Sequence, residues 1–151
     1  MHLVRRVSIL AVAVAVLATA STAYGFSAGF YRTKPPSSRS TFLDFSFKAT
    51  SSKVTKIRYD FRKPNACNGG QALTGDESPY TTATGAIPPA AIKPSGKFTI
   101  NRSSSSGGSL TIAGKLVGQT AAGTLKIHAE FSGGAIVCDT GNLAWRALKL
   151  G

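Results

Sequence analysis

Near its end the chain carries residues 137–147, VCDTGNLAWRA, which contain one of its two cysteines and its only tryptophan. Side chains alternate between the two faces of a strand, so Leu143, Trp145 and Ala147 would share one face. We predict that this stretch is the closing strand of a small β-domain. Its cysteine can tie the strand to Cys67, which stands in a segment of turn-forming residues.

The same alternation of apolar and polar side chains recurs upstream of that stretch. It is clearest over residues 42–49 and 54–62, and the few polar residues between these runs favour a hairpin. Further strands are expected over residues 26–32, 80–87, 96–101, 109–117 and 120–131. Prolines and glycines interrupt the pattern over residues 63–78, which we expect to form a long loop.

No stretch after the first 23 residues has a convincing helical period. The sequence therefore predicts an all-β fold, a single antiparallel β-sandwich or flattened barrel of seven to eight strands. Gly114, Gly118 and Gly123 would stand where long strands bend or turn tightly, which favours the barrel slightly.

The first 23 residues have the form of a secretory signal peptide. A basic start precedes an apolar run over residues 7–17, and small residues follow it. We expect cleavage after Ala23, with Ala20 and Gly25 as the next choices. A membrane anchor is the rival interpretation, but a span needs about 20 apolar residues and this run is close to half that length. Residues 24–151 would then be one secreted domain without a transmembrane segment.

The chain is strongly basic, with 18 Lys and Arg against 6 Asp and Glu and a net charge of +12 at pH 7. Loss of Arg5 and Arg6 with the signal peptide would leave 16 of the 18 basic side chains and all 6 acids, and thus a net charge of +10. Such a balance favours contact with anionic polymers, such as teichoic or uronic polysaccharide, lipid head groups or nucleic acid. The basic residues stand singly, which also fits a charge that only keeps the domain soluble.

Cys67 and Cys138 allow a single disulfide, which we expect in an exported chain. It would close a loop of about 70 residues, for which the chain-entropy model gives roughly 4 kcal/mol of stabilisation. A metal site on the two thiolates lacks partners, because each cysteine stands alone and only His128 could join them. No metal and no cofactor are expected.

Most aromatic side chains alternate correctly for a core, namely Phe45, Phe47, Tyr59, Phe61, Phe98, Phe131 and Trp145. Tyr31, Phe42 and Tyr80 are the rings that the pattern leaves for the surface. Exposed rings between Lys and Arg side chains suit nucleic acid or acidic polysaccharide. Export argues against an intracellular nucleic-acid role, so no nucleic-acid partner is expected.

Catalytic residue sets are scarce. His2 would leave with the signal peptide, and His128 lies on the polar face of a predicted strand, so a Ser-His-Asp triad is rejected. No Walker loop, dinucleotide fingerprint or paired-cysteine metal motif occurs. A glycosidase needs only two carboxylates, and the acids are Asp44, Asp60, Asp76, Glu77, Glu130 and Asp139. We predict that the protein is not an enzyme, with a carboxylate-dependent hydrolase as the alternative.

Six short motifs give the chain a resemblance to a recurring type of small exported β-domain in high-GC Gram-positive bacteria. They are Gly29-Phe30-Tyr31, the Cys67 loop, Gly96-Lys97-Phe98, the runs over 112–116 and 122–125, and Cys138-Asp139-Thr140-Gly141 followed by Trp145. The resemblance implies the β-fold and the disulfide. It carries no activity and no catalytic residue.

These observations predict a non-catalytic, monomeric domain that is secreted or held at the cell envelope. Its expected partner is an anionic glycan or another extracellular polymer. Lys48, Lys56 and Arg58, on the polar faces of the first hairpin, are the candidate contacts. Besides the hydrolase, a barrel that carries an apolar ligand is an alternative, and it would need an interior void of several hundred Å³.

Overall fold

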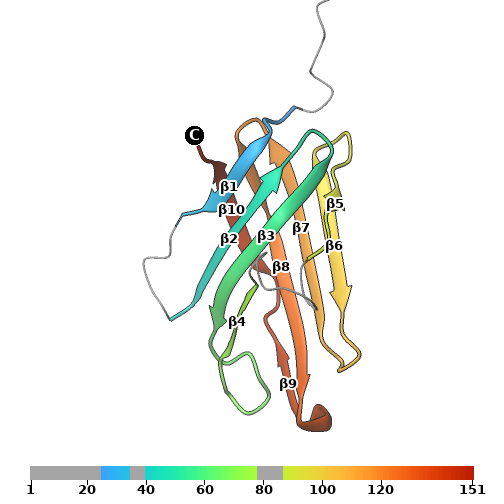
Figure 1. Cartoon of the computed structure of the whole chain (residues 1–151). Coiled ribbons are helices and arrows are strands. Elements are labelled where there is room, and N and C mark those ends of the chain that lie inside the picture. The colour runs from blue at the N-terminus through green and yellow to red at the C-terminus, as the bar shows by residue number, and fades with distance from the viewer. Residues whose placement is uncertain (1–24, 35–39, 78–86) are drawn as a thin grey trace, which may run out of the picture.

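Ten antiparallel strands form one sheet in a computed structural model that describes residues 25–34, 40–77 and 87–151 (Figure 1). The predicted signal peptide and all of the predicted strand over 80–87 except Ile87 lie outside the described residues. Within the described residues there is no α-helix and thus no helix long and apolar enough to cross a membrane. The predicted all-β antiparallel fold is confirmed, although the described residues form ten strands rather than the predicted seven to eight.

The strands are β1 (Gly29–Thr33), β2 (Phe42–Ala49), β3 (Lys53–Lys63), β4 (Leu73–Glu77), β5 (Ala90–Ala91), β6 (Lys97–Ser103), β7 (Ser109–Val117), β8 (Thr120–Phe131), β9 (Ile136–Asp139) and β10 (Leu143–Lys149). One short 3-10 turn, η1 (Ser132–Gly134), precedes β9. The order in the sheet is β4-β3-β2-β1-β10-β8-β7-β6, with β5 paired to β3 and β9 paired to β8.

The sheet curls on itself, so that β2 and β3 cross in front of β7 and β8 (Figure 1). The short strand β5 pairs with β3 and also contacts β6, the last strand in the sheet order. The second strand of that order, β3, and the last strand, β6, therefore meet at β5. The result is a partly closed, flattened barrel with its core between the two crossing layers.

The prediction of a loop over residues 63–78 is wrong for its second half, which forms β4. This strand pairs with β3 from Tyr59↔Glu77 to Lys63↔Leu73. Gly75 and Asp76 are poor strand formers, so local propensity hid the strand. The long edge of β3 supplies hydrogen-bonding partners, and this pairing outweighs the low strand propensity of Gly75 and Asp76.

The single closing strand predicted over residues 137–147 is two strands, β9 and β10. Both pair with the same edge of β8, β10 with its first half and β9 with its last residues. Gly141, with a left-handed φ of 62°, lies in the connection between them. Cys138 is consequently on β9, whereas Trp145 is on β10 and points into the core as predicted.

Trp145 packs over two glycines that the register places beside it. The row Trp145↔Gly123↔Gly114↔Phe98 runs across β10, β8, β7 and β6. A Cβ at Gly114 would lie 2.6 Å from the Phe98 ring and 2.7 Å from the indole. Gly114 and Gly123 therefore make room for the indole rather than bend the strands, whereas Gly118, with a φ of 57°, forms the predicted turn.

Aromatic rings fill the core at this level. The Trp145 ring centroid lies 4.6 Å from that of Phe45, 6.0 Å from that of Phe47 and 6.2 Å from that of Phe98. Tyr31 stacks on Phe47 at 5.2 Å and is fully buried, so its predicted exposure is wrong. Its hydroxyl donates to the Ser27 carbonyl at 2.6 Å, which satisfies the buried phenol.

Phe131 was predicted in the core and is instead 48% exposed. It stands at the last position of β8, beyond His128, where pairing with β7 ends. No strand of the described sheet covers Phe131 on the β7 side. The alternation of apolar and polar residues therefore extends beyond the part of β8 that is packed against the core.

The predicted pairing of Cys67 with Cys138 is confirmed, with the two sulfur atoms 2.01 Å apart. The segment around Cys67 lies along the free edge of β9. Asn68 donates its backbone N–H to the Val137 carbonyl at 3.0 Å, and Asp139 donates to the Ala66 carbonyl at 2.9 Å. The bond thus fastens the β3–β4 connection to β9.

Replacing both cysteines, C67A/C138A, should lower the free energy of unfolding by about 4 kcal/mol, because the unfolded chain regains the entropy of an open loop. Chemical denaturation of the variant and of the oxidised wild type measures the difference. Equal unfolding free energies would show that the edge hydrogen bonds alone hold this segment.

Gly123→Ala should lower the free energy of unfolding by about 3 kcal/mol, because the new methyl group would collide with the Ala113 carbonyl and the Trp145 indole. Ala122→Ser is the matched control, since the neighbouring side chain is exposed on the outer face. Thermal unfolding should separate the two variants. Similar losses in both would contradict the packing role assigned to Gly123.

Candidate functional site

The outer face of β1, β2 and β3 gathers polar side chains from three strands, and we call it the β1–β3 face. Strand register sets its rows. Phe30 stands opposite Lys48, and Arg32 stands opposite Ser46, which stands opposite Arg58. In the following row Asp44 stands opposite Asp60. Residues that are far apart in sequence therefore share one surface.

Phe30, Lys48 and Lys56 form one part of this face, the Phe30 site. The Phe30 side chain is 45% exposed. The Lys48 Nζ lies 5.6 Å and the Lys56 Nζ 5.8 Å from the centre of its ring, within the range of cation–π attraction. Two ammonium groups and an accessible ring are thus held together, which is an arrangement that favours an anionic ligand with an apolar surface.

A β-bulge in β3 directs Lys56 toward this site. The pairing of β2 with β3 shifts by one residue between Ser46 and Lys48, and Lys56 has a left-handed φ of 50°. As a result Val54 and Ile57 are both buried while the two residues between them face outward. A left-handed lysine costs about 1–3 kcal/mol, and bulges often re-aim functional side chains.

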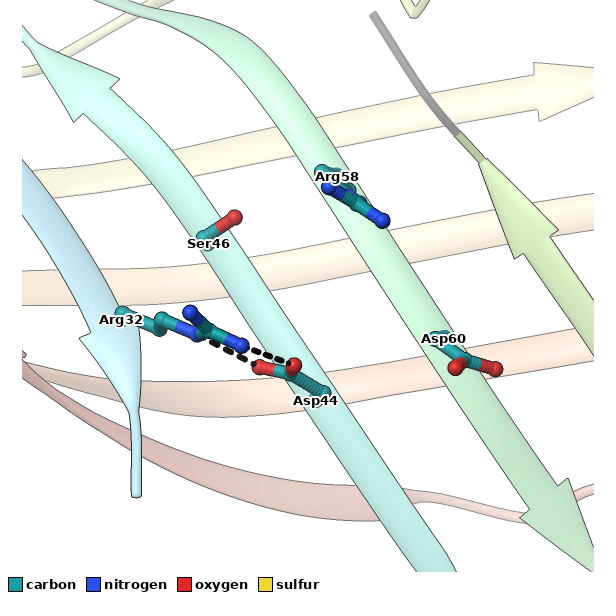
Figure 2. A pocket seen from close by; sticks show the side chains of 5 residues that line it. All are labelled: Arg32, Asp44, Ser46, Arg58 and Asp60. Carbon is teal, nitrogen blue, oxygen red and sulfur yellow. Dashed lines mark hydrogen bonds and ion pairs between the residues drawn. The ribbon is translucent and has the colours of Figure 1, made fainter. Parts of the chain in front are cut away.

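The second part of the face is a hollow of about 90 Å³ around Ser46, which we call the Ser46 pocket (Figure 2). It is lined by Arg32, Asp44, Ser46, Arg58 and Asp60. The two arginines come from β1 and β3 and stand on either side of Ser46. Two carboxylates lie one row away, so donors and acceptors line different parts of the same hollow.

Arg32 and Asp44 are held rigidly in this pocket. Arg32 donates from Nη2 to Asp44 Oδ2 at 2.7 Å and from Nε to Oδ1 at 3.2 Å, as the dashed lines in Figure 2 mark. The buried Thr33 hydroxyl donates to the same Oδ1 at 3.2 Å and accepts the Phe45 backbone N–H at 2.9 Å. The ion pair raises the pKa of Arg32 through the hydrogen bond and the charge of Asp44, so the guanidinium stays charged.

Ser46, Arg58 and Asp60 keep their hydrogen-bonding groups free. Within the described part of the chain, none of these side chains makes a hydrogen bond or an ion pair. Figure 2 shows Arg58 and Asp60 on β3, across the hollow from Arg32. The like charges of Asp44 and Asp60 stand directly opposite each other, which destabilises a sheet by a few tenths of a kcal/mol. The pocket therefore offers unsatisfied donors and acceptors to a ligand.

The predicted polymer contacts are brought together only in part. Lys48 and Lys56 meet over Phe30, whereas Arg58 lies in the adjoining Ser46 pocket. The sequence reasoning missed Phe30, because it placed the neighbouring Tyr31 at the surface. Adjacent aromatic residues in a strand face opposite sides, so a buried Tyr31 would have indicated an exposed Phe30.

Around His128 there is a second charged cluster, on β8 and β9. His128 lies 3.3 Å from Glu130 and 3.5 Å from Asp139, and Lys126 lies 3.5 Å from Asp139. Asp139, the last residue of β9, also accepts the Gly141 backbone N–H at 2.7 Å. Within the described residues no group of three or more His, Cys, Asp or Glu side chains is arranged to hold a metal ion.

Comparison of the chain with protein-family models, with curated proteins and with solved structures finds no match. The resemblance to small exported β-domains therefore stays a prediction.

Replacing Asp139 by Asn should lower stability at neutral pH, with a loss that fades in acid. Burial acts to raise the pKa of Asp139, but the Gly141 N–H, the Lys126 charge and the His128 side chain outweigh it and lower the pKa below its ordinary 3.8. The carboxylate thus adds stability above that value, and this stability is lost as the pH falls through the folded pKa. Urea unfolding of D139N and of the wild type at several pH values in the acid range measures the difference in their unfolding free energies. A difference that does not change with pH would contradict the assignment.

Proposed function

We propose that the protein is a non-catalytic binding domain that contacts an anionic extracellular polymer through its β1–β3 face. The observation that carries the proposal is the Phe30 site, where two ammonium groups lie within 5.8 Å of the centre of an exposed ring. The ring offers an apolar surface to the polymer, and the ammonium groups attract its negative charges. The net charge of +10 that would remain after loss of Arg5 and Arg6 steers such a polymer toward the protein.

Action outside the cell or at the cell envelope is part of this proposal. It is supported by the signal-like pattern of the first 23 residues and by the disulfide, since disulfides persist mainly in oxidising compartments. A single binding site of this exposed kind is weak, so we propose that a repeating polymer engages several protein monomers along its length.

The hydrolase alternative is less well supported by the geometry. Asp44 and Asp60 are neighbours, but Asp44 is ion-paired with Arg32 and Asp60 is exposed. Glycosidase acids commonly stand in apolar pockets, whereas this hollow is lined entirely by polar and charged side chains.

The carrier alternative is also less well supported. The aromatic rings around Trp145 occupy the interior at their level. A hollow of about 450 Å³ opens near Tyr59, Leu110 and Ile127, but its other lining residues are Arg102, His128, Gly108 and four serines. Apolar ligands favour cavities with predominantly apolar walls.

The test compares two double variants that remove the same charge. K48Q/K56Q should weaken binding to polygalacturonate about tenfold or more, or about 1.4 kcal/mol, because both ammonium groups of the Phe30 site are lost. K97Q/K115Q is the control, since these exposed lysines are cross-strand partners on β6 and β7, away from the face. Its affinity should change much less. Affinities are measured by isothermal titration calorimetry at constant ionic strength, and equal losses in both variants would mean that net charge alone drives binding.

A further inference from the structure

We infer that the Ser46 pocket selects a polysaccharide whose sugar units carry both an acid group and free hydroxyls. This inference rests on the proposed function and narrows it from anionic polymers in general to acidic glycans. It follows from the separation of donors and acceptors within the pocket and from its position beside the Phe30 site.

The donors form a row across three neighbouring strands. Arg32, Ser46 and Arg58 stand opposite one another in register, and neighbouring strands lie about 4.8 Å apart. Asp44 occupies Nε and one N–H of Nη2 on Arg32 and fixes the guanidinium in place. The other guanidinium N–H groups make no hydrogen bond within the part of the chain that the structure describes. A carboxylate or sulfate bound here would accept hydrogen bonds from fixed and charged donors, which are the strong ones.

The acceptors form the next row. Asp44 and Asp60 lie two positions along their strands from Ser46 and Arg58, a step of about 7 Å. Among the described residues neither oxygen of Asp60 has a hydrogen-bonding partner, and an ionised carboxylate only accepts hydrogen bonds. A ligand must therefore present O–H or N–H donors to this row. A sugar acid does so, because its acid group and its hydroxyls stand at opposite sides of one ring.

The carboxylates of the pocket weaken the binding of polyanions that have no hydroxyl groups. A polyphosphate chain has no hydroxyl to donate, and its charges would face Asp60, which has no ion-pair partner among the described residues. Discrimination between ligands often comes from such an unpaired charge rather than from added attraction. The Phe30 site, by contrast, attracts either polymer through Lys48 and Lys56.

The two sites together fit at least two consecutive sugar units. Ser46 and Lys48 lie two residues apart on β2, and Arg32 and Phe30 lie two residues apart on β1. A glycan that runs along these strands would place one unit in the Ser46 pocket and the next against the Phe30 ring. Galacturonate monomer should consequently bind more weakly than its trimer, by more than the statistical effect of chain length.

The experiment measures binding of trigalacturonate and of short inorganic polyphosphate to the purified wild type and to Asp60→Asn. We expect D60N to bind trigalacturonate about fivefold more weakly, since an amide is a poorer acceptor for hydroxyls. The same variant should bind polyphosphate more tightly, because the repulsion is removed. Glu130→Gln, which changes the net charge equally on β8, should alter the two affinities in the same direction and to a similar extent. Ser46→Ala, which removes one neutral donor, should weaken trigalacturonate binding.

If D60N strengthens binding of both ligands, Asp60 only repels anions and the inference is overturned. The K48Q/K56Q variant separates this result from failure of the proposed function. Loss of affinity for both ligands in K48Q/K56Q keeps the Phe30 site as the polymer contact, whatever D60N shows. Unchanged affinity in K48Q/K56Q would overturn the proposed function and the present inference with it.

Discussion

The packing of the Trp145 indole against bare backbone governs the shape of this molecule. Gly123 and Gly114 provide no side chain at the two positions beside it, so the ring lies close to β8 and β7 and reaches Phe98 on β6. From the other layer Phe45 and Phe47 pack on the same ring. Large rings facing glycines pull the two crossing layers together, which is how one continuous sheet comes to enclose a core.

That inward packing fixes what β1 and β2 present outward. Since Phe45 and Phe47 are committed to the core, the intervening Ser46 and the flanking Asp44 and Lys48 must face the solvent. On β3 the alternation alone would not bring Lys56 to Phe30, and the bulge supplies the extra residue. The bulge allows both Val54 and Ile57 to be buried, and the strained backbone at Lys56 brings its ammonium group over Phe30.

Much of the fold could be predicted from the sequence, because long strands with one buried face have a strict period. The strands over 42–49, 109–117 and 120–131 have the predicted bounds. The disulfide was predictable because only two cysteines exist. By contrast, β4 and the division between β9 and β10 depend on which edge is available for pairing. A local sequence pattern contains no such information.

The candidate site could be predicted only as a list of basic residues. Lys48 and Lys56 were identified from their polar faces, but their meeting at Phe30 depends on the pairing of β1 with β2 and on the bulge. The Ser46 pocket joins Arg32 to Asp44, twelve positions later, and to Arg58 on a third strand. Register between strands creates that pocket, and register follows from the core of the whole domain.

The pairing of β1 with β10 constrains how the chain acquires its structure. The first and last strands are hydrogen-bonded neighbours, from Tyr31↔Lys149 to Thr33↔Ala147. The sheet order is therefore continuous only once β10 has left the ribosome. Contacts between the two ends of a chain close slowly, because the entropy of the intervening loop is lost before they form. We therefore expect β2 and β3 to pair as a local hairpin before β10 is available, and the complete tertiary structure to form only after β10 has been synthesised.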